Sequence, residues 1–271
     1  MKFTAAVFLL ILLTSCGQSI NKVLKNPDPQ YKLRMAEQYY ANKKYVQAQQ
    51  VYEDIMPLFR GQPEFEDIYY KYAYTAYNQK DYLNAENLFK GYLEIYSTSA
   101  RAEEVDYMRS YTFYMQSPKA ALDQTATLKA IGMFQTFINT HPGSARNKEA
   151  TVLIDQLRQK LEVKDMKAAQ LYFDIGQFRA AAVAFNTMLN QYADTEKADQ
   201  YKLMAIKSYF RFAEMSVEER KGERFEKVIE EANDFMDRFP ESPLVKEVQQ
   251  FVTSSKNNLK IYSNEPVKTS T

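Results

Sequence analysis

A short aromatic and alanine pattern recurs along the chain, and it constrains the fold more than any other feature. An aromatic residue is followed three positions later by Ala or Val, and four positions after that by an aromatic residue or Ala. The instances are Tyr45-Ala48-Tyr52, Tyr82-Ala85-Phe89, Phe178-Ala181-Phe185 and Phe225-Val228-Ala232, with Ala130-Phe134-Phe137 in the same register. Self-similarity at intervals of a few tens of residues is typical of repeat architectures, in which each unit packs on its neighbours.

Short breaks separate the repeated units and predict where helices end and begin. Their sequences end in Ser or Thr: Tyr96 to Ser99, His141 to Ser144, Tyr192 to Thr195 and Phe239 to Ser242. A hydroxyl at such a place can accept a hydrogen bond from a free N–H group at the start of the following helix. Between the breaks apolar residues recur at helical spacing. We therefore predict an all-α fold of ten principal helices in five antiparallel pairs.

The repeated units resemble the tetratricopeptide repeat, which has a small residue in its first helix and an aromatic-Ala-aromatic pattern in its second. The matching residues are Ala36, Tyr39, Tyr45, Ala48 and Tyr52; Ala73, Tyr82, Ala85 and Phe89; and Ala169, Tyr172, Phe178, Ala181 and Phe185. The resemblance implies a superhelix of about five helix pairs over residues 29–262. Segments 116–128 and 216–224 are interpreted as insertions in the third and fifth units.

The N-terminal residues have the pattern of a targeting segment. Lys2 precedes an apolar run of about 11 residues, which is too short to span a bilayer but suits a signal peptide. The run ends in Leu13-Thr14-Ser15-Cys16, and Cys16 is the sole Cys of the chain. This ending resembles a bacterial lipobox, which implies a signal peptide over residues 1–15 and a lipidated Cys16. Residues 16–28 would form the tether, and residues 263–271 a frayed tail. A plain secretory signal with an incidental Cys is the alternative.

Composition argues against several classes of function. One Cys and one His leave no basis for a zinc or disulfide framework, and a net charge of +1 gives no basis for nucleic-acid binding. His141 lies in a break beside Pro142, and the paired acids Glu103-Glu104 and Glu230-Glu231 are interpreted as solvated helix faces. We therefore expect no enzyme activity, no catalytic residues, no metal site and no cofactor. The mixed-charge run 218–231 is interpreted as an exposed helix, with docking of a partner subunit as the alternative.

Lipobox and repeats together resemble the BamD-like family of outer-membrane protein assembly lipoproteins. Further elements of the resemblance are Val105 to Arg109 and the break that follows Phe137. It implies a membrane-anchored partner of the β-barrel assembly machinery. The partners would be the periplasmic domains of a BamA-like β-barrel insertase and unfolded outer-membrane protein precursors. Because no acidic residue directly follows Cys16, we expect the periplasmic face of the outer membrane.

Tyrosines are concentrated in the first two units, where 13 of the 21 lie between Tyr31 and Tyr96. Tyr combines an apolar ring with a hydroxyl and is enriched in recognition surfaces. Helical spacing places a set of residues on one stripe that is predicted to bind extended peptides: Leu33, Glu37, Tyr40, Tyr70, Tyr74, Tyr77 and Asn78. For any one of these rings, a place in the repeat's own core is an equal alternative.

Two other functions remain open at the level of sequence. One is a different periplasmic repeat adaptor that serves envelope or cell-division complexes. The other is a SusD-like glycan-binding lipoprotein, which usually needs a longer chain and favours Trp, a residue that is absent here.

Overall fold

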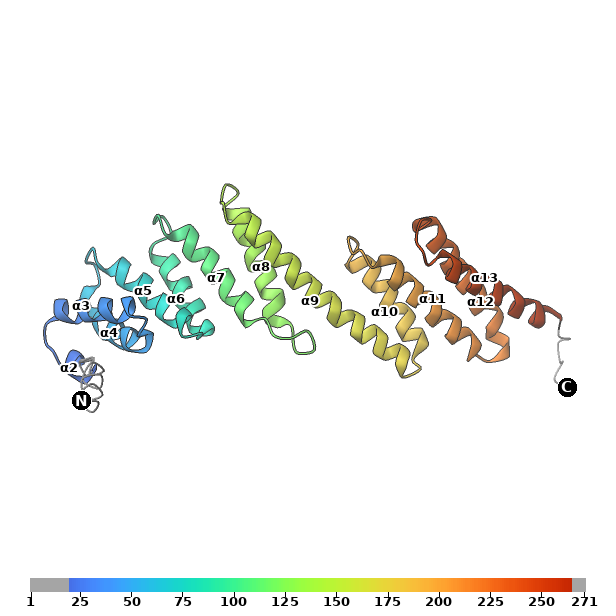
Figure 1. The fold of residues 1–271 in the computed structure, drawn as a ribbon, viewed down its shortest axis with the longest axis horizontal. Helices are drawn as coiled ribbons and strands as arrows, with labels where there is room; N and C mark the ends of the chain where they lie inside the picture. Colours follow the sequence, from blue (N-terminus) through green and yellow to red (C-terminus); the bar gives the residue numbers. More distant parts are fainter. Residues whose placement is uncertain (1–19, 265–271) are drawn as a thin grey trace, which may run out of the picture. The chain divides into compact units, whose positions relative to one another are not determined.

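A computed structural model describes residues 20–264 of the chain, and every regular element in that range is an α-helix. Figure 1 shows the helices as a succession of pairs. Their bounds are α2 Ile20–Leu24, α3 Pro29–Ala41, α4 Tyr45–Phe59, α5 Phe65–Asn78, α6 Tyr82–Ile95, α7 Ala102–Gln116, α8 Thr125–Thr140, α9 Asn147–Asp174, α10 Phe178–Gln191, α11 Ala198–Glu214, α12 Glu218–Arg238 and α13 Val245–Asn264. The predicted five pairs are confirmed as α3–α4 to α11–α12, and the structure adds α2 before them and α13 after them.

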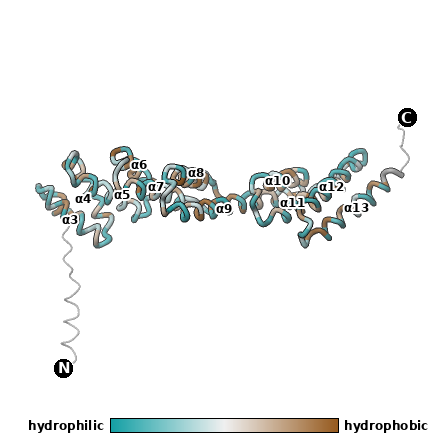
Figure 2. Tube along the Cα trace, turned by 90° about the horizontal axis from the view of Figure 1, so that it is seen from above, coloured by the Kyte–Doolittle hydropathy of each residue, from teal (hydrophilic) through white to brown (hydrophobic). Residues whose placement is uncertain are grey.

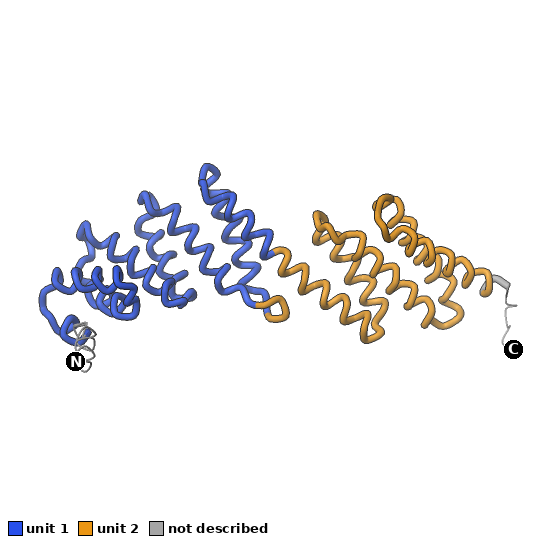
Figure 3. Tube along the Cα trace, in the orientation of Figure 1, with its two compact units in different colours: residues 1–118, 123–157 blue, residues 119–122, 158–271 orange. Residues whose placement is uncertain are grey.

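The chain divides into two compact units, coloured separately in Figure 3. Unit 1 comprises residues 1–118 and 123–157, and unit 2 comprises residues 119–122 and 158–271. Within unit 1 successive helices from α3 to α8 pack on one another, and within unit 2 the same holds from α10 to α13. Each unit therefore builds its own succession of packed helices.

The repeated aromatic and alanine positions form the core, as the sequence pattern predicts. Ala48, Ala85 and Ala130 are fully buried in unit 1, and Ala181 is fully buried in unit 2. The aromatic residues four positions later are buried as well: Tyr52, Phe89, Phe134 and Phe185. A small side chain lets two helices approach closely, and the ring one turn further on fills the space between neighbouring pairs. Burial of a ring of this size contributes about 1.5–3 kcal/mol.

The hydroxyl at the end of each break hydrogen-bonds both to the start of the following helix and to an acid of the preceding first helix. Ser99 accepts from the N–H of Arg101 at 3.1 Å and donates to Glu66 on the preceding first helix at 2.5 Å. The same arrangement recurs as Ser144 with Arg146 and Glu103, Thr195 with Lys197 and Glu162, and Ser242 with Leu244 and Asp199. In each case the N–H belongs to the residue directly before the helix. The hydroxyl therefore also ties each pair to the previous one.

The turns inside three of the pairs share one backbone conformation. Lys43, Lys80 and Gly176 have φ values of 58°, 64° and 78°, in the left-handed region. In each turn the N–H of this residue bonds to the carbonyl three residues back, and the next N–H bonds to the carbonyl five residues back. Gly adopts this conformation readily, whereas a residue with a Cβ adopts it at a cost.

Two segments differ from what the sequence suggested, and a third agrees with it. The tether expected to be a spacer contains α2, whose Val23 is fully buried and which packs on α3 and α4. The spacer is limited to the residues between α2 and Pro29, where Asp28 caps α3 by accepting the N–H of Gln30 at 2.9 Å. The segment 216–224, interpreted as an insertion, lies mostly in the first two turns of a 21-residue α12. The segment 116–128 does contain an irregular connection, between α7 and α8.

The predicted signal peptide and Cys16 lie outside the described residues, as does most of the predicted tail. Helix α13 ends at Asn264, within two residues of the predicted end of the repeat domain. In Figure 2 hydrophobic and hydrophilic residues alternate along each helix. In keeping with this, none of the helices in residues 20–264 is both long and apolar enough to cross a membrane.

Candidate functional site: a tyrosine-lined surface of unit 1

The predicted stripe residues of α5 form a continuous row of half-buried rings. Tyr70 and Tyr74 have ring centroids 4.7 Å apart, and Tyr74 and Tyr77 have centroids 6.2 Å apart. Their inner faces pack on the core cluster that α5, α6 and α7 build, where Tyr74 meets Phe89 edge-on at 5.2 Å. Each ring therefore belongs partly to the core and partly to the surface. We call this row, with its continuation on α7 described below, the tyrosine stripe.

A carboxylate on the neighbouring first helix holds two hydroxyl groups of the stripe. Tyr70 donates to Glu104 at 3.0 Å, and Tyr74 donates to the same carboxylate oxygen at 2.7 Å. Burial raises the pKa of both phenols, and for Tyr74 the hydrogen bond to Glu104 raises it further. Both hydroxyls thus stay protonated at neutral pH, and their rings are fixed in orientation.

A series of ion pairs, here called the ion ladder, links the first helices of unit 1 beside the stripe. Its members are Glu37, Asp67, Lys71 and Arg101. Lys71 contacts Glu37 of α3 at 2.5 Å and Asp67 of its own helix at 2.7 Å. Arg101, at the start of α7, contacts Asp67 at 2.9 Å and stacks over the ring of Tyr70 at 4.5 Å. Burial alone would lower the pKa of Lys71, but its two carboxylate partners outweigh that effect and raise it. The ladder fixes α3, α5 and α7 in register.

The predicted residues of α3 occupy a different environment from those of α5. Leu33 is half-buried against the first core cluster, and Glu37 accepts a hydrogen bond from Tyr52 at 3.0 Å. Tyr40 packs on Tyr45 at 5.8 Å and on Tyr52 at 6.5 Å, and burial is the main factor that raises its pKa to about 12. Of the seven predicted residues, Glu37 joins the ladder, whereas Leu33 and Tyr40 pack on their own pair.

Asn78, the last predicted residue, is exposed at the end of α5. Its side-chain amide donates to the carbonyl of Tyr74 at 2.7 Å, so it caps its own helix. That bond uses one of its two amide hydrogens and leaves the carboxamide at the surface.

Sequence reasoning missed the continuation of the stripe on α7. The ring of Tyr77 lies 6.5 Å from that of Tyr111, which stacks on the ring of Tyr107 at 6.1 Å and lies tilted against that of Tyr114 at 5.4 Å. Tyr107 is buried in the core, whereas Tyr111 and Tyr114 are half-buried. These three residues follow Tyr70, Tyr74 and Tyr77 by 37 positions each, the same interval that separates Ala48 from Ala85. The repeat interval was therefore a sufficient signal to find them.

Unit 2 carries a hollow of about 740 Å³, lined by side chains of α10, α11 and α12. Tyr209 and Phe212 contribute aromatic rings, and the charged lining consists of Arg179, Arg220, Glu223, Arg224, Glu226, Lys227 and Glu230. Several of these charges pair with each other, as Arg220 does with Glu223 at 3.1 Å. This hollow contains part of the mixed-charge run for which docking was the alternative interpretation.

His141 takes part in a contact between helices. Its Nε2 lies 3.0 Å from an Asp106 oxygen of α7, and its ring packs on Phe137 at 4.9 Å. No group of three or more His, Cys, Asp or Glu residues that could hold a metal ion occurs in the described part of the chain.

Comparison with known protein families identifies the family to which the chain belongs. The family described as "YfiO: Outer membrane lipoprotein" matches residues 28–224, which is most of the chain. The chain belongs to this family. The YfiO match begins at the cap of α3 and ends inside α12, so it includes the whole tyrosine stripe.

Structural comparison finds a further repeat protein. A solved structure described as the "TPR2AB-domain:pHSP90-complex of yeast Sti1" matches 84% of this chain and 98% of its own, with 10% sequence identity and a TM-score of 0.39. A search of curated proteins finds no match.

Proposed function

We propose that this YfiO-family lipoprotein is a scaffold and receptor of the β-barrel assembly machinery, and not an enzyme. In this proposal, acylated Cys16 anchors it to the periplasmic face of the outer membrane. Unit 1 receives unfolded outer-membrane protein precursors, and unit 2 contacts the periplasmic domains of a BamA-like insertase. The observation that carries the proposal is the tyrosine stripe, which continues over two repeats in a member of an outer-membrane lipoprotein family.

The spacing of the stripe supports an extended peptide as its ligand. Side chains on one face of a β-strand recur every two residues, about 6.6–6.8 Å apart. The middle of the stripe comes near this spacing, with ring centroids 6.2 Å apart from Tyr74 to Tyr77 and 6.5 Å apart from Tyr77 to Tyr111. The steps at its two ends are shorter, at 4.7 Å from Tyr70 to Tyr74 and 5.4 Å from Tyr111 to Tyr114. A precursor segment with aromatic residues at alternate positions therefore matches the row formed by Tyr74, Tyr77 and Tyr111. Aromatic pairs contribute about 0.5–1.5 kcal/mol each beyond the area they bury.

Peptide binding tests the receptor part of the proposal. The ligand is a synthetic peptide with aromatic residues at alternate positions and a free C-terminus, and binding is followed by fluorescence anisotropy. Tyr77→Ala combined with Tyr114→Ala should weaken binding at least tenfold, while helical circular dichroism stays at the parent level. The control is Tyr172→Ala, since Tyr172 is an exposed Tyr of unit 2. Equal binding by the double variant and the parent would contradict the proposed receptor surface.

Co-purification tests the scaffold part. Arg179 lines the hollow of unit 2, is exposed, and has no ion pair within residues 20–264. Arg179→Glu should reduce recovery of a large β-barrel protein with periplasmic domains from solubilised membranes. Arg158→Glu in α9, an exposed arginine of unit 2 outside the lining of the hollow, should leave that recovery unchanged. Recovery of cell-wall enzymes alone would favour the adaptor alternative.

The anchor is tested separately. Cys16→Ala should move the protein from the membrane fraction into the soluble extract, and mass spectrometry of the parent should show a fatty-acylated N-terminal Cys. Tight membrane association of the Cys16→Ala variant would show that acylation is not what holds the chain.

A further inference from the structure

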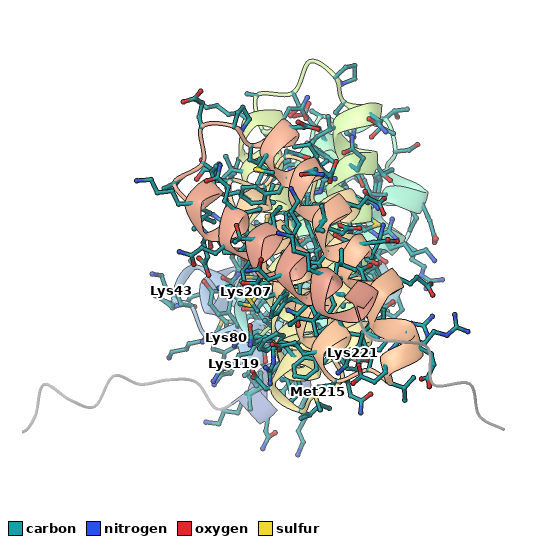
Figure 4. All side chains as sticks on the ribbon, turned by 90° about the vertical axis from the view of Figure 1, so that its right-hand side faces the viewer. Lys43, Lys80, Lys119, Lys207, Met215 and Lys221 are labelled. Atoms are coloured by element: carbon teal, nitrogen blue, oxygen red, sulfur yellow. The ribbon has the colours of Figure 1, made fainter. Side chains whose placement is uncertain are left out.

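One edge of unit 1 carries exposed lysines on three successive elements. Helix α2 contributes Lys22, with Lys25 directly after it, and the turn between α3 and α4 contributes Lys43 and Lys44. The turn between α5 and α6 contributes Lys80. Figure 1 shows α2 and these two turns along the lower edge of unit 1, and Figure 4 shows Lys43 and Lys80 on the same side. None of the five has an ion pair or side-chain hydrogen bond within the described residues of the chain.

Two of these lysines occupy backbone positions that favour glycine. Lys43 and Lys80 have φ values of 58° and 64°, and the equivalent turn in unit 2 has Gly176 with a φ of 78°. The backbone hydrogen bonds of the three turns are the same. A Cβ in this conformation is destabilising, so Gly would serve the fold better at both positions. The two lysines are therefore not explained by the folding of their own turns.

Neighbouring acids do not neutralise this edge. Asp81 follows Lys80, but its carboxylate caps α6 by accepting the N–H of Asn84 at 3.3 Å. Asp28 follows α2 and caps α3. Five lysines against these two acids leave a net positive edge.

The chain leading to this edge is short. Cys16 precedes Ile20, the first residue of α2, by four residues, which reach about 14 Å at most when extended. Helix α2 packs on α3 and α4, with Val23 fully buried. It therefore fixes unit 1 to the end of the short segment. An acyl chain on Cys16 would hold the lysine edge close to the lipid headgroups.

We infer that the lysine edge of unit 1 docks on an anionic lipid bilayer surface, as a second contact beside the acyl anchor. The inference rests on the proposed lipid anchor at Cys16. Clustered lysines next to a membrane anchor attract anionic headgroups, and each strengthens the association by about fivefold near the surface. Acyl anchors are commonly reinforced by such a basic patch. The docked edge sets the orientation of unit 1, because both turns and α2 face the membrane together.

Vesicle co-sedimentation tests the inference without the acyl chain. The protein is the chain from residue 16 onward with Cys16→Ala, and the vesicles are phosphatidylcholine with or without 30% phosphatidylglycerol. Binding should require phosphatidylglycerol and should be lost at 500 mM salt, where exposed charges are screened. Lys43→Gly combined with Lys80→Gly should weaken binding roughly 25-fold, from two lysines at about fivefold each.

The glycine double variant separates binding from folding. Since Gly suits both turns, the thermal unfolding midpoint of the double variant should be equal to or higher than that of the parent. Its vesicle binding should nevertheless fall. The control is Lys90→Gln with Lys148→Gln, which removes two charges from other parts of unit 1 and should leave vesicle binding nearly unchanged. Equal loss in this control, equal binding of neutral and anionic vesicles, or parent-like binding by the glycine variant would overturn the inference.

Two further outcomes are informative. Retention on an acidic-peptide resin without any vesicle binding would assign the edge to an acidic protein and overturn the inference. Peptide binding to the tyrosine stripe should be unchanged in the glycine variant. Loss of vesicle binding and loss of the receptor function are therefore distinguishable.

Discussion

The hydroxyl of Tyr74 donates to Glu104 at 2.7 Å, a bond that joins the first helices of two neighbouring repeats. Tyr70 donates to the same carboxylate oxygen, so one acid on α7 fixes two adjacent rings of the tyrosine stripe. The outer faces of these rings are held in place before any ligand arrives. A rigid aromatic surface loses little conformational entropy on binding, which favours affinity.

Removal of the Tyr74 hydroxyl should cost stability but preserve the stripe. Tyr74→Phe is expected to lower the free energy of unfolding by about 1 kcal/mol, since the lost partner is charged but partly exposed to solvent. Tyr74→Ala should cost about 3 kcal/mol, because the ring also packs on Phe89. Urea unfolding measures both. Tyr82→Phe is the control, since the Tyr82 hydroxyl makes no hydrogen bond within residues 20–264, and it should change stability by less than about 0.5 kcal/mol.

Gly91 of α6 makes room for a ring of the neighbouring helix. A Cβ at this position would clash with the Tyr69 hydroxyl, and Tyr69 packs between Phe65 and Tyr92, which limits its rotation. Gly91→Ala should therefore destabilise by about 1–3 kcal/mol. In a Tyr69→Phe background the ring carbon at 3.4 Å is an ordinary contact, and the same change should stabilise by up to about 1 kcal/mol through helix propensity. Additive effects of the two substitutions in thermal unfolding would contradict this account.

Sequence predicted the helix pairs and the core because both depend on local patterns. The buried alanine and aromatic positions, such as Ala48 and Tyr52, recur at equivalent places in successive helix pairs. The Ser and Thr hydroxyls of the breaks recur in the same way. The polar contacts between neighbouring helix pairs were not predicted. Lys71 meets Glu37 across 34 residues, and no local pattern in one sequence specifies which charged residues of successive helices will meet.

The tyrosine stripe was likewise predicted only in part. Its α5 residues were found from helical spacing, whereas Tyr107, Tyr111 and Tyr114 required the 37-residue interval to be applied to the first helices as well. Short helix α2 was missed because two prolines nearby favour irregular structure, and only packing on α3 and α4 stabilises five helical residues.

Glu66 should make stability depend on pH in the acid range. Hydrogen bonds from Ser99 and Tyr92 stabilise its carboxylate and lower its pKa below the ordinary value of 4.5. Between the lowered pKa and 4.5 the unfolded chain binds more protons than the folded one. The contribution is therefore fully present above about pH 5 and is lost as the pH falls through the lowered pKa. Glu66→Gln should show a smaller loss of stability between pH 5 and pH 3 in urea unfolding. An unchanged acid slope would exclude this role.

Lys202 of α11 is the buried centre of an ion cluster in unit 2. Its ammonium lies 2.6 Å from Glu231 and 2.5 Å from Asp234, and only 5% of its side chain is exposed. Burial alone would raise the pKa of Glu231, but its hydrogen bonds to Lys202 and Lys227 lower it, so the acid is charged at neutral pH. Lys202→Met should cost about 3 kcal/mol at pH 7, because it leaves Glu231 buried with a single cationic partner.

A second substitution tests whether that cost comes from the buried charge or from lost packing. Glu231→Leu in the Lys202→Met background removes the unpaired carboxylate and should recover most of the loss, since apolar replacement of a buried pair is often nearly neutral. Urea unfolding of the parent, both single variants and the double variant gives the coupling between the two positions. A coupling near zero would mean that Lys202 stabilises unit 2 through its aliphatic stem and not through Glu231.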